Sequence, residues 1–298
     1  MEKRITPAIT SPQYLVDTDV TFAQVDDWFG HTSMDLKLDI IYPENPGHPY
    51  PCIVWICGGG WKQMDKSAHL YYLSYLASKG FVVASLQYRT SNLARFPAQL
   101  EDIKAGIRFL KSRSKRYNID TNKFGIMGES AGGHLAAMAG LTGKITEFDK
   151  GDHMEFSSAV QAVCTWYLPS KLDEVQSRDS EYSPETETEQ EELEEFIYGQ
   201  SSSESLLIGK NARLCRDLAA VASPVNYVTK EAPPFLIFHG TRDSIVPYSQ
   251  SKLMYDLLQE KGIKADFISV EGADHADLHF FQKETWDLIV EFFTGIFI

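Results

Sequence analysis

Short runs of apolar residues alternate with longer amphipathic segments along most of this 298-residue chain. Continuous apolar runs are typical of strands that are buried on both faces, and the longer segments between them can supply covering helices. Residues 98–116, for example, repeat apolar side chains at three- and four-residue spacing, as one face of a helix requires. We therefore expect a mostly parallel sheet with helices on both faces. The expected strands are 36–42, 51–56, 81–86, 123–127, 159–164, 234–238 and 265–270.

The segment 171–222 interrupts this alternation, because it places far more chain between two strands than a usual connection holds. Within it, Ser183, Pro184 and the acidic residues after them are typical of the start of a helix, and Gly199 follows a short apolar stripe. We expect residues 1–298 to form a single α/β domain, with a small helical cap inserted at about 171–222.

The formal net charge is −13. Much of it lies between Lys171 and Glu195, a segment that contains eleven acidic and two basic residues. Such a charge repels phosphate backbones and anionic lipids, so we expect no nucleic-acid or membrane partner. We interpret the acidic run as a solvated helix face in preference to a lid that repels anionic ligands.

The N-terminal residues lack the apolar stretch of a secretory signal, and the apolar C-terminal run is too short to span a membrane and carries Glu291. The cysteines show no metal-ligand spacing and are expected to be free thiols: Cys52, Cys57, Cys164 and Cys215. These features predict a cytoplasmic location and no metal site.

The motif Gly128-Glu-Ser130-Ala-Gly132 lies between an expected strand and a segment with helical character. A G-x-S-x-G pattern in this context forms a sharp turn that exposes the serine hydroxyl, and its glycines relieve crowding in the turn. We therefore predict that Ser130 is a nucleophile. An incidental Gly/Ser turn is the alternative, and the flanking strand and helix make it the weaker interpretation.

A serine hydroxyl becomes a strong nucleophile when an imidazole accepts its proton, so the chain must supply a histidine and an acid that orients it. In the fold that carries this motif, the acid and then the histidine follow late strands. Asp243 and His275 occupy these positions and are the predicted acid and base. Asp274 and Asp277 stay open as alternative acids. We interpret three other histidines as structural: His134, His239 and His279.

Another expected strand runs into Cys57-Gly58-Gly59-Gly60-Trp61. Attack on an ester places negative charge on the carbonyl oxygen, and backbone N–H groups without side chains can approach it closely. Gly58, Gly59 and the amide of Ala131 are the predicted oxyanion hole. A phosphate-binding loop is the rival interpretation, but the chain lacks G-x-G-x-x-G and the Lys-Ser/Thr ending of a P-loop here.

These motifs resemble the carboxylesterases of the α/β-hydrolase superfamily, on the branch with hormone-sensitive-lipase-like and feruloyl or acetyl-xylan esterase-like (BD-FAE-like) members. The similarity extends from about Leu36 to the C-terminus. The similar segments are 57–61, which we call the glycine loop, Tyr88-Arg89, 96–102, 128–133, 222–224, 239–247 and His275. The resemblance implies an α/β-hydrolase fold, and its elbow, acid, base and oxyanion hole agree with the residues above. The long N-terminal cap of lipase-like relatives is missing, which favours the carbohydrate-esterase-like branch.

Cys57 departs from this resemblance, since relatives usually have histidine at this position. A thiol makes weaker hydrogen bonds than an imidazole, so we expect a less rigid oxyanion loop. Cys57 as a nucleophile is an alternative that the intact serine motif disfavours.

We expect a serine carboxylesterase that removes short acyl groups, such as acetyl, from a carbohydrate or another small soluble alcohol. The mechanism needs no metal or organic cofactor, and the expected partner is the small-molecule ester. Trp61, Trp166 and Tyr167 follow strand ends and are candidates to line the acyl or sugar pocket, although they are equally suited to the core.

Two other functions stay open. The same triad can hydrolyse amides, either as an aryl formamidase or as a peptidase-like relative. Outside enzymes, the fold also occurs as a non-catalytic binding module, which the presence of all three triad residue types disfavours.

Overall fold

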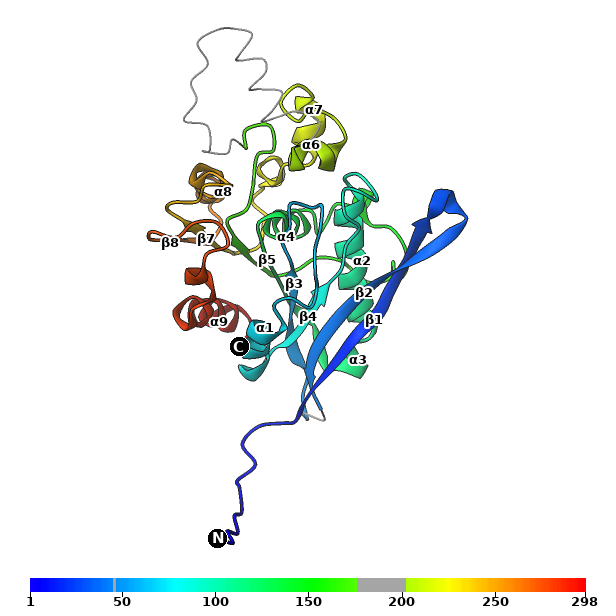
Figure 1. Ribbon diagram of the computed structural model, residues 1–298. Helices are drawn as coiled ribbons and strands as arrows, with labels where there is room; N and C mark the ends of the chain where they lie inside the picture. The colour runs from blue at the N-terminus through cyan, green and yellow to red at the C-terminus, as the bar shows by residue number, and fades with distance from the viewer. Residues whose placement is uncertain (45–46, 176–201) are drawn as a thin grey trace.

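The computed structural model describes residues 1–44, 47–175 and 202–298. Within these residues, eight strands form one sheet in the order β1-β2-β4-β3-β5-β6-β7-β8 (Figure 1). The first three strands in this order pair antiparallel, and the others pair parallel. The strands are β1 (Tyr14–Asp27), β2 (Thr32–Pro43), β3 (Tyr50–Ile56), β4 (Val82–Leu86), β5 (Ile119–Glu129), β6 (Ala162–Trp166), β7 (Phe235–Gly240) and β8 (Ala265–Val270). The prediction of a mostly parallel sheet is confirmed.

The strand β1 was not predicted from the sequence. It pairs with β2 at the edge of the sheet, and the two strands form a long ribbon that extends beyond the helices (Figure 1). Most of its side chains are exposed or half-buried, and only Phe22 is buried. An edge strand with little burial carries no continuous apolar run, which explains why the pattern missed it.

Helices cover both faces of the sheet, as predicted. On one face, a core cluster includes Leu100 of α2, Leu135 of α4 and Met254 of α8. On the other, a second cluster includes Leu73 of α1 and Phe293 of α9. The longer helices are α1 (Leu70–Ser78), α2 (Ala98–Ser112), α4 (Ala131–Leu141), α8 (Tyr248–Glu260) and α9 (Lys283–Phe297). The short ones are α3 (Ser114–Tyr117), α6 (Ser203–Ile208) and α7 (Arg216–Val221), with 3-10 turns at Trp28–Gly30, Thr146–Phe148, Pro224–Tyr227 and Leu278–Phe281.

Part of the predicted cap belongs to the described chain. The helices α6 and α7 bury Leu207 and Ala219 against the first core cluster, and Ser203 lies close to Gly60 of the glycine loop. The helix predicted to start at Ser183 lies outside the described residues, so the cap as a whole stays a prediction. No helix in the described ranges is long and apolar enough to cross a membrane.

Candidate active site

Ser130 lies at the turn between β5 and α4, where the first residues of the helix follow directly on the strand. Its backbone has φ 51° and ψ −122°, a strained conformation for a residue with a side chain. The Ser130 amide donates to the Trp166 carbonyl at 2.9 Å, which fixes the turn to the end of β6. This is the strained strand-to-helix turn that the G-x-S-x-G pattern requires.

The two glycines of the motif are needed because backbone segments approach them closely. A Cβ added to Gly132 would lie 2.1 Å from the Ile56 carbonyl oxygen, and one added to Gly128 would lie 2.5 Å from the Gly132 oxygen. Real Cβ atoms do not approach backbone this closely, so the turn packs against the end of β3 only without these side chains.

The structure brings Ser130, His275 and Asp243 together. The Nε2 atom of His275 lies 3.0 Å from Ser130 Oγ, and its Nδ1 atom lies 2.8 Å from Asp243 Oδ2. Asp243 follows β7 and His275 follows β8, so both loops leave the carboxyl ends of parallel strands. Because Asp243 is ionised and only accepts, Nδ1 carries the proton and Nε2 is free to accept the serine proton.

Asp243 is buried and well supported as an anion. Its Oδ1 accepts the amides of Ile245 and Val246 at 3.0 and 2.8 Å, and His239 Nε2 lies 3.2 Å from Oδ2. Burial alone would raise the pKa of Asp243, but the hydrogen bonds from His239 and His275 outweigh it and hold the pKa well below its usual range.

The alternative acids contact other groups. Asp274 accepts the amide and hydroxyl of Ser244 and the backbone amide of His275, not its ring. Asp277 pairs with His279, whose side chain is largely exposed. The ring of His275 therefore takes its carboxylate partner from Asp243.

The glycine loop differs from the prediction in one donor. The amide of Gly58 donates to Glu129 Oε1 at 3.4 Å, so this N–H is directed at a buried carboxylate. Gly59 has φ +116°, and a Cβ there would lie 2.0 Å from the Gln63 carbonyl oxygen. Ala131 begins α4, where the first amides of a helix have no intrahelical acceptor. Gly59 and Ala131 thus remain the candidate oxyanion donors, and the direction of the Gly58 amide argues against its predicted role.

The three candidate pocket aromatics are all buried. Trp166 packs among the rings of the second core cluster, as the core interpretation of this residue expects. Trp61 donates its indole N–H to His134 Nδ1 at 3.2 Å. The side chain of Tyr167 borders the triad, since its ring centroid lies 4.5 Å from that of His275.

A group of three side chains beside this loop was not predicted as a site. Glu129 Oε1 lies 3.0 Å from His69 Nε2 and 3.6 Å from Cys57 Sγ, and its Oε2 accepts the Tyr167 hydroxyl at 2.7 Å. Burial would raise the pKa of Glu129, but hydrogen bonds from His69 and Tyr167 hold it below its usual range. Glu129 lies 72 positions from Cys57 and 60 positions from His69 in the sequence, so no local spacing could reveal the group.

Cys57 is a thiol in this environment. Burial and the neighbouring Glu129 carboxylate raise the pKa of Cys57 to about 12. Since the thiolate is the nucleophilic form, the interpretation of Cys57 as a nucleophile is disfavoured. Its carbonyl accepts the Tyr88 hydroxyl at 3.1 Å, which supports the loop from the adjacent strand end.

Other motif residues hold the framework together. Arg89 makes a two-pronged ion pair with buried Asp102, which joins the loop after β4 to α2. His134 and His239 are fully buried and hydrogen-bonded within the fold, in accord with their predicted structural roles.

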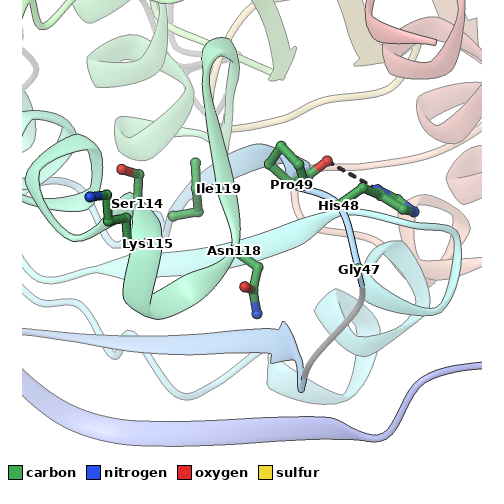
Figure 2. A pocket seen from close by; sticks show the side chains of 7 residues that line it. All are labelled: Gly47, His48, Pro49, Ser114, Lys115, Asn118 and Ile119. Carbon is green, nitrogen blue, oxygen red and sulfur yellow. Dashed lines mark hydrogen bonds between the residues drawn. The ribbon is translucent and has the colours of Figure 1, made fainter.

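A separate hollow of about 550 Å³ lies away from the triad (Figure 2). It is lined by residues 47–49, before β3, and by Ser114, Lys115, Asn118 and Ile119, at α3 and the start of β5. These residues lie at the amino ends of the parallel strands, whereas the triad lies at the carboxyl ends. The hollow therefore takes no part in the site described above.

A family model described as BD-FAE matches residues 38–258. The chain belongs to the BD-FAE family. Esterase LipC of Mycobacterium tuberculosis is 29% identical over 232 residues, which cover 77% of this chain and 54% of LipC. The probable isoprenylcysteine alpha-carbonyl methylesterase ICMEL1 of Arabidopsis thaliana is 28% identical, covering 87% of this chain and 52% of that protein. This BD-FAE chain thus spans about half the length of the curated relatives it matches.

Solved structures agree with this family. A truncated carbohydrate esterase from gut microbiota is 31% identical with a TM-score of 0.79, covering 96% of this chain and 99% of that one. An acetyl ester-xyloside bifunctional hydrolase from Caldicellulosiruptor lactoaceticus is 25% identical with a TM-score of 0.71, covering 88% and 89%. The chain is therefore an α/β-hydrolase of an esterase family, which confirms the fold and the family predicted from the sequence.

Proposed function

We propose that this BD-FAE protein hydrolyses carboxylic esters, with Ser130 as nucleophile, His275 as general base and Asp243 as the acid that orients the base. The observation that carries the proposal is the continuous chain of contacts from Asp243 through His275 to Ser130, at 2.8 and 3.0 Å. The strained backbone of Ser130 supports it, because strain is kept at functional turns.

In the proposed reaction, Ser130 Oγ attacks the acyl carbonyl carbon while its proton passes to His275 Nε2. The amides of Gly59 and Ala131 stabilise the oxyanion, and Asp243 stabilises the imidazolium. Protonated His275 then gives its proton to the departing alcohol, and water hydrolyses the acyl-enzyme by the same steps. These steps use no metal or organic cofactor.

The proposed substrates are short acyl esters, such as acetyl groups on a carbohydrate or another small soluble alcohol. Two observations support this class. Two structural neighbours are named as a carbohydrate esterase and an acetyl ester-xyloside hydrolase. The buried ring of Tyr167 lies against His275 and restricts the room beside the base. A cytoplasmic location, which would favour short imported oligosaccharides over polymers, belongs to the same proposal.

The test uses purified protein with 4-nitrophenyl acetate, butyrate and longer esters, followed by acetylated xylo-oligosaccharides. We expect hydrolysis that falls with acyl length and requires Ser130. Activity confined to long, insoluble esters would overturn the substrate class. Hydrolysis of aryl formamides without hydrolysis of any ester would overturn the proposed bond type.

A further inference from the structure

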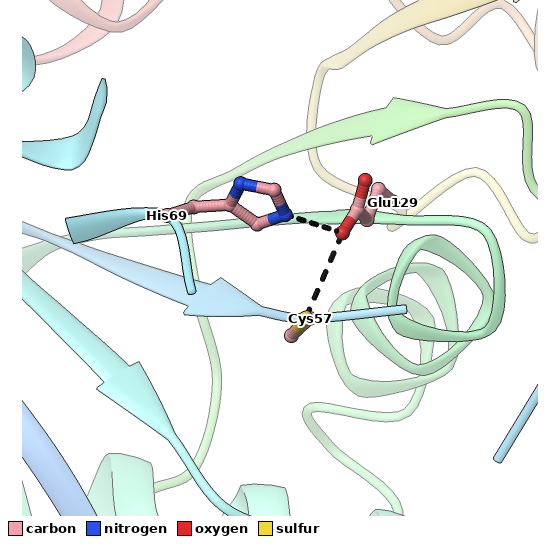
Figure 3. Close-up of side chains that lie close together, drawn as sticks. All are labelled: Cys57, His69 and Glu129. Carbon is pink, nitrogen blue, oxygen red and sulfur yellow. Dashed lines mark hydrogen bonds and ion pairs between the residues drawn. The ribbon is translucent and has the colours of Figure 1, made fainter. Parts of the chain in front are cut away.

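Three potential metal ligands from separate segments meet beside the glycine loop (Figure 3). Cys57 follows β3, His69 precedes α1 and Glu129 ends β5. The atoms Sγ, Nε2 and Oε1 of this group, which we term the Cys57 cluster, all lie within 4.8 Å of one another. In the described part of the chain, this is the one group of three such residues close enough to share an ion.

We propose that the Cys57 cluster binds Zn²⁺ or a similar divalent cation, and that occupation of this site slows the ester hydrolysis proposed above. Thiolate, imidazole and carboxylate are the three ligand types that Zn²⁺ takes in proteins. Ligand atoms of a tetrahedral zinc site lie about 3.3 to 3.6 Å apart, given its bond lengths. The Oε1 atom is already 3.6 Å from Sγ and 3.0 Å from Nε2, and Sγ and Nε2 lie within 4.8 Å of each other. Coordination therefore needs the Sγ–Nε2 separation to reach about 3.6 Å.

The surroundings of the cluster suit a cation. A carboxylate and a thiolate together balance two positive charges, and the carboxylate of Asp65 adds further negative potential near Cys57. The Tyr167 hydroxyl donates to Glu129 Oε2, so Oε1 is the oxygen turned toward the other ligands. Such outer contacts orient ligands in metal sites. The His69 side chain is 19% exposed and gives the cation its entry.

Coordination changes no oxidation state. The Cys57 thiol releases its proton to water as the sulfur–metal bond forms. Before binding, His69 Nε2–H donates to the Glu129 carboxylate, which can only accept. On binding, Nε2 releases this proton to water and Nδ1 takes one up from water, so that the Nε2 lone pair and Glu129 Oε1 bind the metal. The hydrogen bond between His69 and Glu129 is replaced by one metal bond to each, and a water molecule can take the fourth position.

The cluster is joined to the proposed reaction by its sequence neighbours. Cys57 precedes Gly58, and Glu129 precedes Ser130. The Oε1 atom that would bind the cation is the acceptor of the Gly58 amide at 3.4 Å, so the cation competes with this contact. The backbone of Gly58 packs closely against Ser130, since a Cβ added to Gly58 would lie only 3.2 Å from Ser130 Cβ. A movement of the glycine loop would therefore change the position of the Ser130 side chain. This step rests on the proposed function, whereas metal binding itself does not.

The binding test titrates Co²⁺ into reduced, chelator-treated full-length protein. We expect a thiolate-to-cobalt absorption band that Zn²⁺ abolishes by displacing cobalt. The band should be lost in Cys57→Ser and require at least about tenfold more cobalt in His69→Gln, which can still donate to Glu129. It should persist in Ser130→Ala and in the matched control Cys215→Ser, since Cys215 is a partly exposed cysteine outside the cluster. Circular dichroism verifies that each variant is folded.

The absence of a thiolate band, or a band that persists in Cys57→Ser, would overturn the site. The activity test compares inhibition of nitrophenyl acetate hydrolysis by Zn²⁺ in the wild type, Cys57→Ser and Cys215→Ser. We expect Cys57→Ser to need at least about tenfold more zinc for half-inhibition than wild type and Cys215→Ser. Equal sensitivity would place the inhibitory ion elsewhere, such as at His275, and overturn the coupling. A protein that binds cobalt through Cys57 but cleaves no ester would contradict the proposed function and leave the metal site standing.

Discussion

The Nε2 atom of His275 lies 3.0 Å from the Oγ atom of Ser130, although 145 residues separate them in the sequence. The contact joins the loop after β8 to the turn after β5 and places a proton acceptor on the serine hydroxyl. A hydroxyl without such an acceptor is a weak nucleophile, so the first two predictions follow from this contact and from the carboxylate behind it.

We expect Ser130→Ala to lower the turnover of short-chain nitrophenyl esters by about four to six orders of magnitude, since the acyl-enzyme cannot form. The matched control is Ser74→Ala, which alters an exposed serine on α1 and should leave turnover unchanged. A fluorophosphonate should label the wild type and the control but not Ser130→Ala. Near-normal turnover in Ser130→Ala would refute the assignment of the nucleophile.

Asp243→Asn should lower kcat by about 10⁴, because an amide no longer selects the imidazole tautomer with a free Nε2. The matched control, Asp256→Asn, alters an exposed ion pair with Lys252 and should keep wild-type kcat. Steady-state kinetics of both variants measure the effect. Equal activity of the two variants would show that Asp243 does not orient the base.

The same carboxylate links stability to pH. The pKa of Asp243 is held below its unfolded value, so the folded state is favoured above the unfolded pKa and loses this stabilisation as the pH falls through the acidic range. Urea unfolding of Asp243→Asn should therefore show a flatter loss of stability than the wild type below about pH 4. Parallel curves for the two proteins would contradict the predicted shift.

Much of the fold was readable from the sequence because its signals are local. Buried parallel strands show as continuous apolar runs, and the Ser130 turn follows from glycines at fixed spacing. The edge strand β1 escaped prediction because most of its side chains face water. The order of acid and histidine along the chain then located Asp243 and His275 without knowledge of any distance.

The rest of the site depends on contacts that no spacing encodes. Glu129 occupies the variable second position of the motif, yet its carboxylate accepts the amide of Gly58 and pairs with His69. Aromatic residues at strand ends are equally suited to a pocket and to a core, and only their packing in the fold distinguishes the two roles. Trp166, for example, packs against the rings of other tryptophans in the core. The role of Gly58 could not be read from the glycine loop alone, since it depends on this buried partner.

His134 makes the stability of the fold depend on pH in the mildly acidic range. Its Nε2 lies 2.6 Å from the Ala222 carbonyl and its Nδ1 accepts from Trp61, so the ring is neutral with its proton on Nε2. Burial lowers the pKa of His134 from 6.5 to about 4. The unfolded chain therefore binds this proton first, and stability is lost as the pH falls from about 6.5 toward 4.

This loss amounts to up to about 3 kcal/mol over the whole range. Urea unfolding between pH 7 and 4 measures it, and His134→Gln should lose less stability in this window than the wild type. The matched control is His279→Gln, which alters an exposed histidine and should behave as the wild type. An unchanged pH dependence in His134→Gln would contradict the prediction.

Gly132→Ala tests the close packing of the turn after β5 against the end of β3. The added methyl would lie 2.1 Å from the Ile56 carbonyl oxygen, and backbone rather than a flexible side chain must move to admit it. We expect a loss of about 1 to 3 kcal/mol in the free energy of unfolding. The folded fraction of Gly132→Ala should also have a lower kcat, because the movement of the turn displaces Ser130 from His275.

The matched control is Gly295→Ala in α9, where the methyl meets nothing within 4 Å. Alanine favours a helix over glycine by up to about 1 kcal/mol, so this variant should be as stable as the wild type or more stable, with unchanged kcat. Urea unfolding and steady-state kinetics on the two variants separate tight packing at the turn from a general effect of replacing glycine. Equal stability of the two variants would mean that β3 and the turn can separate at little cost, and that the approach of Ile56 to Gly132 does not hold Ser130 in place.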